Sequence, residues 1–502
     1  MELHPDICYA ALSARDRRFD GVFYVGVSTT GIFCRPVCTA RLPRRDRCTF
    51  YSNAAAAEAA GFRPCLRCRP ELAPGTARVD AVSRVARMAF DRIEAGELTD
   101  RSLSDLAADL GVSARQLRRV VEQTYGVTPV QLAQTRRLLL AKQLIADTQL
   151  SMADIAFAAG FSSVRRFNHL FRHRYGLQPS AMRRGRRQSD QQGLELRLGY
   201  RPPLDWAGLS GFLASRGAPA VEQVADGEYR RTVRLDERVG WLAARPAKGQ
   251  RPELLLRVSE SLVPALTPLL ARARQLFDLD ADPAPIDAQL RDDPLLGPCV
   301  ASAPGLRIPG GLSGFEVALR AILGQQISVR AATTLYGRFA ERFGTIIETP
   351  WPTLERTPPA AETVAEASLQ SLIDLGLPAR RAQTIQQVAQ AVSQGQLRLD
   401  PSAAAQETMD ALQAIPGIGP WTVQYLAMRV LGQPDAWPAS DLGLMKAAGC
   451  STPKALEQQA EVWRPWRSYA AMHLWQSLTR TCLLYTSPSP RDRTRSRMPS
   501  SA

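Results

Sequence analysis

Hydrophobic residues change their spacing along this chain, and the changes divide it into segments. From about residue 77 to 187, apolar positions recur every three or four residues, which is typical of amphipathic helices. Four short runs then predict strands, at 194–200, 228–235, 240–247 and 253–258. Helices are expected near 206–215 and 262–277, and helical spacing returns at Phe315 and continues to Trp475. The pattern predicts a multidomain, mainly α protein with an α+β unit and an antiparallel sheet in its middle.

Two segments of the first helical region share one pattern. Each has an apolar helix, a glycine turn (Gly111 or Gly160), a serine that can cap, and a second helix rich in arginine. They are predicted helix-turn-helix motifs whose second helices enter successive stretches of a major groove. The expected exposed contacts are Arg115, Gln116, Arg118 and Arg119 in the first unit and Ser163, Arg165, Arg166 and His169 in the second. The alternative is a generic helical bundle.

A glycine-rich turn followed by a single carboxylate marks the last third of the chain. In Ile-Pro-Gly-Ile-Gly-Pro, Gly417 and Gly419 permit positive φ and close backbone approach, and a helix opens directly afterwards. Such a turn directs free amides toward a phosphate. Asp441 lies about twenty residues further on, behind a proline-rich bend. An ordinary connection between two helices is the alternative.

The charge of the chain is high and uneven. The 502 residues carry a formal charge of +15, with 30 Lys/Arg against 18 Asp/Glu in residues 1–190 and 29 of each in residues 191–481. A basic front half favours a polyanionic partner, most simply nucleic acid, over a merely solvated cationic surface. No apolar run is long enough to span a membrane and no secretory signal opens the chain, so we expect a cytoplasmic protein.

Two pairs of cysteines predict a metal site. Cys34 and Cys38 are separated by three residues, and Cys65 and Cys68 by two. Four thiolates at these spacings suit tetrahedral Zn²⁺ better than disulfides in a reducing compartment. Cys48 lies between the pairs and is expected to be a spectator thiol.

The residues around these cysteines, TTGIFCRPVC, FYSN and GFRPCLRC, resemble the N-terminal domain of the bacterial Ada family. The resemblance implies that Cys34, as a zinc-bound thiolate, accepts a methyl group irreversibly from a DNA phosphotriester. Methylation of one of four thiolates would change the net charge of the site from about −2 to about −1 and so strengthen DNA binding. From spacing alone, a zinc knuckle that only folds the domain is the alternative.

The second helix-turn-helix resembles the AraC-type signature. AGFSS, Phe167, Phe171, the Tyr175-Gly176 pair and Pro179 stand in the places that this family uses. The resemblance implies an all-α double helix-turn-helix domain, with promoter DNA and RNA polymerase as partners.

The C-terminal half, about 194–480, resembles the helix-hairpin-helix DNA glycosylases and specifically the AlkA type, which has an extra sheet domain. RAILGQQIS, IPGIGPWT and WRPWRSYAAMHLW carry the resemblance. It implies that amides of Gly417 and Gly419 grip the DNA backbone, with Na⁺ or K⁺ on the hairpin carbonyls, and that Asp441 is the catalytic aspartate. The implied base-pocket residues are Trp421, Tyr425 and Trp475, and the implied wedge into the duplex is Gln326. The alternative for Trp421, Tyr425 and Trp475 is packing in the core. For Gln326 the alternative is a polar residue at a helix end.

This resemblance carries a mechanism. A purine alkylated at N3 or N7 is already a cationic leaving group, so the enzyme need not protonate it. Base release would then need only three steps: the base flips out of the duplex, it stacks on Trp or Tyr, and one carboxylate stabilises the sugar cation. Relatives that also cleave the strand have a lysine after the hairpin, where this chain has Trp421. The chain is therefore expected to be a monofunctional glycosylase that leaves an abasic site. The guanine-repair motif PCHR of the Ada family is absent, and Cys299 receives no role.

These segments predict five consecutive units. They are an Ada-like zinc-binding methyl-acceptor domain at 1–76, an AraC-type DNA-binding domain at 77–187, an AlkA-like α+β domain at 188–305, a helix-hairpin-helix glycosylase domain at 306–481 and a disordered, non-native tail at 482–502. The predicted function is excision of alkylated purines such as 3-methyladenine from double-stranded DNA, with a regulatory head. The alternatives are an alkylation-sensing transcription factor with a vestigial glycosylase, and a purely architectural DNA binder.

Overall fold

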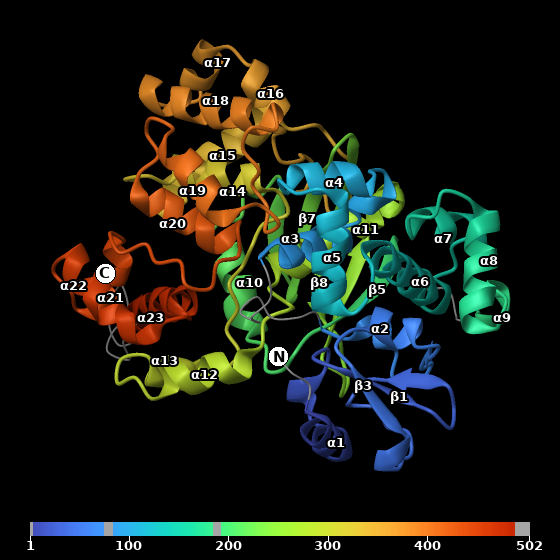
Figure 1. Ribbon diagram of the computed structural model, residues 1–502. Coiled ribbons are helices and arrows are strands. Elements are labelled where there is room, and N and C mark those ends of the chain that lie inside the picture. Colours follow the sequence, from blue (N-terminus) through green and yellow to red (C-terminus); the bar gives the residue numbers. More distant parts are fainter. Residues whose placement is uncertain (1–3, 75–83, 184–191, 487–502) are drawn as a thin grey trace, which may run out of the picture.

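The computed structural model describes residues 4–74, 84–183 and 192–486 and confirms the predicted fold class. Figure 1 shows a small sheet domain at the N-terminus, a group of helices beside it, a larger sheet in the centre and a second group of helices that ends the chain. None of the helices in the described part of the chain has the length and apolar character that a membrane span requires.

The N-terminal domain is built around a small sheet in the order β3-β1-β2-β4. Strands β1 and β2 form an antiparallel hairpin, whereas β2 and β4 pair in parallel, with Phe33 opposite Pro64. Its elements are α1 (Pro5–Ala14), β1 (Tyr24–Val27), β2 (Ile32–Cys34), β3 (Cys48–Tyr51), α2 (Ala54–Ala59) and β4 (Arg63–Pro64), with 3₁₀ turns η1 (Arg17–Phe19), η2 (Arg45–Arg47) and η3 (Pro70–Leu72). The parallel pairing brings the ends of β2 and β4 to one edge of the sheet.

The next domain consists of helices that begin at capping side chains. Ser102, Ser113, Ser151 and Ser163 each accept a hydrogen bond from a backbone N–H of the first turn. The elements are α3 (Arg84–Glu94), η4 (Glu97–Thr99), α4 (Leu103–Asp109), α5 (Ala114–Tyr125), α6 (Pro129–Asp147), α7 (Met152–Ala158), α8 (Val164–Tyr175) and α9 (Pro179–Met182). Both predicted helix-turn-helix units are present as α4–α5 and α7–α8, and α6 joins them.

The central sheet is antiparallel throughout, in the order β5-β9-β8-β7-β6. Its strands are β5 (Leu194–Gly199), β6 (Glu222–Ala225), β7 (Glu228–Leu235), β8 (Arg238–Pro246) and β9 (Glu253–Val258). Strand β6 was not predicted, because four residues at a sheet edge with one apolar branched side chain give no periodic signal. The flanking helices are α10 (Trp206–Ala214), η5 (Glu260–Ala265), α11 (Leu266–Leu276), α12 (Pro283–Arg291) and α13 (Gly297–Ser302). The helix predicted at 262–277 starts as η5, which contains Pro264.

The C-terminal domain is entirely helical. Its elements are α14 (Gly314–Leu323), α15 (Val329–Phe343), α16 (Ala361–Glu366), α17 (Leu369–Ile373), α18 (Ala379–Ser393), α19 (Ala405–Gln413), α20 (Pro420–Arg429), α21 (Leu442–Ala448), α22 (Pro453–Ala460), η6 (Glu461–Trp463) and α23 (Arg467–Thr486). Helix α23 runs past the expected boundary at 481, and the rest of the predicted tail lies outside the described residues.

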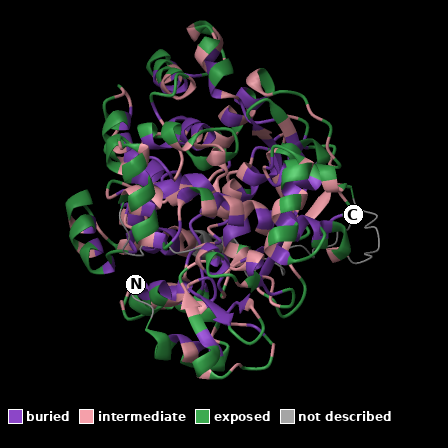
Figure 2. Ribbon diagram, turned by 45° about the vertical axis from the view of Figure 1, so that its right-hand side comes forward, coloured by how far each residue is buried: buried purple, intermediate pink, exposed green. Residues whose placement is uncertain are grey.

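One apolar core joins the second helix-turn-helix to the central sheet. Ile155 and Phe167 belong to the same buried cluster as Leu196 and Leu262. Gln143 of α6 also donates from Nε2 to the carbonyl of Arg197 on β5 at 2.8 Å. Figure 2 shows buried residues across the middle of the molecule and exposed ones around its edge. The polar, basic stretch 183–193 predicts a flexible linker between domains, and most of it, 184–191, lies outside the described residues.

Candidate zinc centre and base pocket

Four cysteine sulfurs converge beside the small sheet. Cys34 ends β2 and Cys65 follows β4, so the parallel pairing of these strands places both at one edge. The Sγ atoms of Cys34, Cys38, Cys65 and Cys68 all lie within 4.8 Å of one another. A tetrahedral Zn²⁺ with Zn–S bonds of about 2.3 Å needs sulfurs about 3.8 Å apart, so the cluster fits zinc. Cys48 lies outside this group, and its thiol faces the carbonyl of Arg44.

Backbone amides surround this cluster unevenly. The amide of Arg35 donates to Cys68 Sγ, and that of Arg67 donates to Cys65 Sγ, each at 3.4 Å. The amide of Ala40 lies beside Cys38. Among the described residues, backbone amides thus lie beside Cys38, Cys65 and Cys68, and none donates to Cys34 Sγ. An N–H···S bond withdraws electron density from a thiolate, and Cys34 lacks this withdrawal by the backbone.

A buried ion pair holds the loop after Cys34. The Arg35 side chain is paired with Asp20, and both residues are buried. Arg35 Nη1 also donates to the carbonyl of Cys68 at 3.1 Å. This guanidinium therefore links the two cysteine pairs and places one fixed positive charge beside the zinc site.

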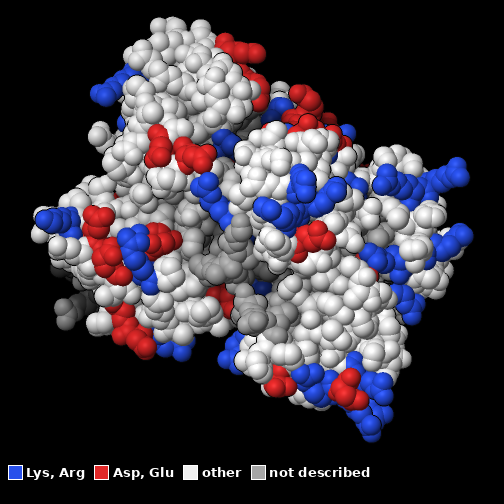
Figure 3. Space-filling view, viewed as in Figure 1, with Lys and Arg blue, Asp and Glu red and all other residues white. Residues whose placement is uncertain are grey.

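The second helices of both helix-turn-helix units turn arginines outward. Arg115 and Arg118 on α5 are exposed, as are Arg165 and Arg166 on α8, while Leu117, Phe167 and Phe171 are buried as predicted. In Figure 3, Lys and Arg side chains gather over the right-hand and lower parts of the molecule, where α8 and the zinc domain lie. This charge distribution suits the phosphates of a duplex.

The predicted glycine hairpin connects α19 to α20. Gly417 has φ of 94°, and Gly419 is the N-cap of α20. A Cβ at position 417 would lie 2.2 Å from Thr384 Oγ1, which donates to the carbonyl of Pro416 at 2.8 Å. Among the described residues, the backbone N–H groups of Gly417 and Gly419 have no hydrogen-bond acceptor. Both amides are therefore available at the N-terminus of a helix.

Asp441 lies at the centre of a hydrogen-bonded group. Trp421 donates from Nε1 to Asp441 Oδ2 at 2.8 Å, and Trp475 donates from Nε1 to Oδ1 at 3.0 Å. The carboxylate also accepts from the backbone of Leu444 at 2.8 Å and so caps α21. Three N–H donors therefore fix the position of this carboxylate. The sequence indicated the two tryptophans as pocket residues but gave no sign that they hold the carboxylate.

Tyr425 lies behind this group. Its ring stacks on Trp421 with centroids 5.0 Å apart and 12° between the planes, and the residue is buried. Arg429 donates to its hydroxyl at 2.7 Å. Burial alone would raise the pKa of Tyr425, but the guanidinium groups of Arg429 and Arg216 lower it below its ordinary value. Two guanidinium groups therefore lie behind the stacked rings of Trp421 and Tyr425.

The predicted wedge residue is exposed at a strained point of the backbone. Gln326 has φ of 59°, which is unusual for a residue other than glycine. The preceding Gln325 donates from Nε2 to the carbonyl of Gly417 at 3.1 Å and to Thr422 Oγ1 at 3.0 Å. The carbonyl of Gln325 accepts from Arg381 at 2.8 Å. These bonds tie the loop at 325–328, which carries the predicted wedge residue, to the hairpin and to α18.

Sequence reasoning missed four side chains of this site: Arg216, Gln325, Arg381 and Arg429. Arg216 comes from the central sheet domain, and its guanidinium lies 3.7 Å above the ring of Phe212. Burial lowers the pKa of Arg216. Because these residues are widely separated in the chain, only the folded arrangement reveals their convergence.

Comparison with known families places each segment. The chain matches the metal binding domain of Ada over 7–71, a helix-turn-helix domain over 106–185, the AlkA N-terminal domain over 195–313 and the HhH-GPD superfamily of base excision DNA repair proteins over 319–465. The match to the AlkA N-terminal domain ends at residue 313, past the domain boundary that was expected at 305. The fold and site thus define a helix-hairpin-helix base excision repair protein with an Ada-type zinc head.

Individual relatives narrow this class. The chain is 41% identical over 493 residues to the probable bifunctional transcriptional activator/DNA repair enzyme AlkA of Mycobacterium tuberculosis, covering 95% of this chain and 97% of that protein. It is 36% identical to DNA-3-methyladenine glycosylase 2 of Escherichia coli over 55% of this chain and 95% of that protein. It is 30% identical to the AdaA bifunctional enzyme of Bacillus subtilis over 36% of this chain and 84% of that protein. The chain belongs to the family of AlkA-type bifunctional transcriptional activator/DNA repair enzymes.

Proposed function

We propose that this protein excises alkylated purines of the 3-methyladenine type from double-stranded DNA, and that its N-terminal half is a DNA-binding regulator that repairs methylphosphotriesters. The observation that carries the first part is the fixed carboxylate of Asp441 between the indole N–H groups of Trp421 and Trp475. The relative from Escherichia coli that is named as a DNA-3-methyladenine glycosylase supports the same reaction.

In the proposed reaction, the damaged nucleotide leaves the duplex and its base enters the aromatic pocket. Gln326 takes the place of the extruded base, and the amides of Gly417 and Gly419 hold the backbone. An alkali cation, Na⁺ or K⁺, on the hairpin carbonyls is part of this proposal. Electron-rich rings favour a cationic base by about 0.5–2 kcal/mol each.

Asp441 stabilises the positive charge that develops on the sugar as the N-glycosidic bond breaks, and orients the water that attacks C1′. The electrons of that bond leave with the base, which becomes neutral because it started as a cation. With Trp421 where strand-cleaving relatives have a lysine, no amine forms a Schiff base, so the product is an abasic site.

Product analysis tests this proposal. A duplex with 3-methyladenine or 7-methylguanine, incubated with the full chain in excess, should release the free base and keep an intact strand until alkali is added. Strand cleavage without alkali would contradict the monofunctional mechanism. Absence of base release would favour the alternative, an alkylation sensor with a vestigial glycosylase.

In the N-terminal domain we propose that Cys34 is the methyl acceptor. Zinc would keep the four sulfurs as thiolates, and among the described residues no backbone amide donates to Cys34 Sγ. The Cys34 sulfur attacks the methyl carbon of the phosphotriester, an S–CH₃ bond forms, and the phosphodiester leaves with the C–O electrons. Loss of one thiolate charge then strengthens binding to promoter DNA, with RNA polymerase as the partner of the activator.

Mass spectrometry of tryptic peptides tests this assignment after incubation with duplex DNA that carries a methylphosphotriester. The expected result is a single methyl group on Cys34. A methyl group on Cys38, Cys65 or Cys68 instead would reject the assignment of Cys34 as acceptor.

A further inference from the structure

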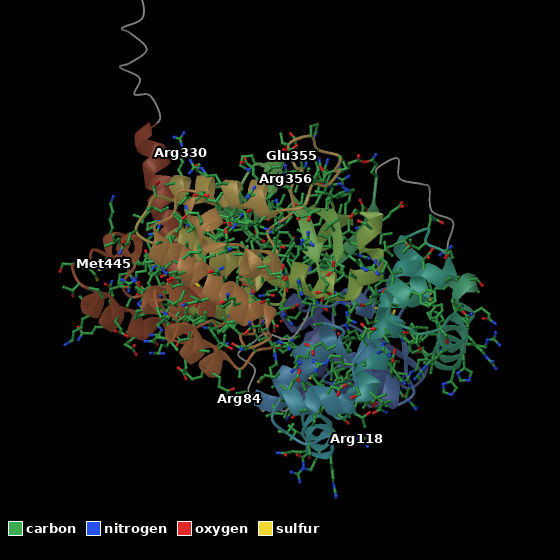
Figure 4. The ribbon with its side chains drawn as sticks, turned by 90° about the horizontal axis from the view of Figure 1, so that it is seen from above. Arg84, Arg118, Arg330, Glu355, Arg356 and Met445 are labelled. Atoms are coloured by element: carbon green, nitrogen blue, oxygen red, sulfur yellow. The ribbon has the colours of Figure 1, made fainter. Side chains whose placement is uncertain are left out.

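The two proposed DNA-binding surfaces lie on different sides of the molecule. The head surface is formed by the recognition helices α5 and α8, and the body surface by the hairpin and the wedge loop 325–328. Arg118 on α5 and Arg330, which follows the wedge loop on α15, are both exposed. Seen from above in Figure 4, these two arginines stand on opposite sides, with the bulk of the protein between them.

Contacts between the head and the body fix this arrangement. Glu97 in the first helix-turn-helix region is paired with Arg398 of the glycosylase domain. Arg136 of α6 donates to Thr267 Oγ1 at 3.4 Å, and Thr267 donates to the carbonyl of Ala158 at 3.4 Å. The second helix-turn-helix shares a buried apolar core with the central sheet. Turning the head toward the body's DNA face would expose that core to water. The free-energy cost would be about 25 cal/mol for each Å² of apolar surface exposed.

Short DNA is too stiff to reach both surfaces. The persistence length of a duplex is about 150 bp, and bending 20–30 bp through 40–90° already costs on the order of 1–6 kcal/mol. A duplex of that length that occupied both surfaces would have to turn around the whole molecule. The two surfaces can therefore be filled together only by separate segments.

We infer that this protein bridges two segments of double-stranded DNA, one on the recognition helices and one in the base pocket. On a long molecule the bridge closes a loop between a head-bound sequence and a distant lesion. On short duplexes it gives a complex of one protein with two DNAs. The inference rests on the proposed function, because it requires that the N-terminal half binds DNA and that the hairpin and Gln326 hold the damaged duplex.

Fluorescence cross-correlation tests the bridge with two 25-bp duplexes that carry different dyes. One duplex has undamaged sequence and the other has a stable abasic-site analogue, and both are present in excess over the full chain at low salt. The head variant reverses the charge of Arg118 and Arg166 (both to Glu), and the body variant is Gly417→Val. Arg238→Glu is the matched control, because Arg238 is an exposed arginine of the β7–β8 hairpin that belongs to neither surface.

The expected result is joint diffusion of the two dyes with the natural chain and with Arg238→Glu, and its loss in both surface variants. Binding of each duplex alone is measured in parallel. Two outcomes overturn the inference: no joint diffusion although each surface binds its duplex singly, or joint diffusion that survives both surface variants. If the body variant still bound the abasic duplex and excised normally, the hairpin assignment in the proposed function would fail instead.

Discussion

Asp441 is held more firmly than a carboxylate at a helix start needs to be. One backbone amide suffices to cap α21, yet two indole N–H groups from α20 and α23 also reach it. These donors keep the oxygens in place without neutralising the charge, which suits a group that must face a developing cation. In the proposed mechanism the same indole rings also border the space for the base, so one pair of side chains would serve both recognition and positioning.

Removing one of these donors should slow excision. Trp421→Phe keeps an aromatic face but loses a hydrogen bond to a charged group, worth about 1.5–3 kcal/mol. We expect single-turnover excision to fall roughly tenfold to a hundredfold. Trp206→Phe is the matched control, because it removes an indole N–H that donates to the carbonyl of Gly227 in the sheet domain. Equal rates for Trp421→Phe and the control would contradict the positioning role.

At the scale of elements, the hairpin depends on one glycine more than on its neighbour. Gly417 combines a positive φ with Thr384 in the space of a Cβ, whereas nothing lies near a Cβ at Gly419. The sequence could show that both glycines permit a tight turn, but only the structure identifies the side chain that would collide.

Gly417→Ala should therefore weaken DNA binding and lower the melting temperature. Gly395→Ala is the control, because Gly395 also has a positive φ (71°) but open space around it. Both changes carry the left-handed penalty of about 1–2 kcal/mol, and only the first displaces the Thr384 side chain. Calorimetry and fluorescence anisotropy measure the two effects. Equal losses in both variants would show that the collision is unimportant.

A buried carboxyl joins three elements of the head. Glu58 on α2 accepts from Thr135 on α6 at 2.8 Å and lies 3.4 Å from Arg174 on α8. Burial raises its pKa to about 7, from an ordinary value of 4.5. The folded protein therefore holds the proton more tightly than the unfolded chain does between these two pH values.

This pKa predicts that the head is more stable in mild acid. The contribution is fully present below pH 4.5 and is lost as the pH rises through 7, by on the order of 3 kcal/mol for a shift of this size. Glu58→Gln should remove this loss and stabilise the head at pH 8 more than at pH 5. Urea unfolding across that range measures the difference, and parallel pH profiles for the two chains would contradict it.

Most elements could be predicted from the sequence because their local signals agree. The signals for α4 to α8 were serines that cap helices, glycines that follow helices, and apolar residues at helical spacing. The spacing of the cysteines indicated the metal cluster. Strand β6 and the convergence of Arg216 and Arg429 on Tyr425 could not be predicted. Strand β6 has too few residues to show an alternation of apolar and polar side chains. The contacts of Arg216 and Arg429 with Tyr425 depend on packing between two domains.

At the scale of the whole molecule, the two candidate sites lie against separate cores. The zinc cysteines belong to a small apolar cluster of the N-terminal domain, and Trp421 and Trp475 pack against the core of the glycosylase domain. The sequence predicted the order of the domains but gave no sign that the head shares a core with the central sheet.

Removal of the metal should therefore separate the two activities. A chelator is expected to release one zinc per chain and to abolish methylation of Cys34. Without the metal, the cysteine sulfurs are protonated thiols, which are poorer nucleophiles than thiolates. Single-turnover excision should stay close to that of the zinc-loaded chain. A parallel fall of both activities would show that the glycosylase domain depends on the zinc fold.

The most direct test of the account is single-turnover excision of 3-methyladenine by Asp441→Asn, with binding to the same duplex measured beside it. Asparagine has nearly the same shape but only one acceptor oxygen, so it keeps the hydrogen bond from one tryptophan at most and carries no charge to stabilise the sugar cation. The account predicts that base release falls at least about a hundredfold, as for loss of a group aimed at transition-state charge, while DNA binding persists. Excision near the rate of the natural chain would contradict it.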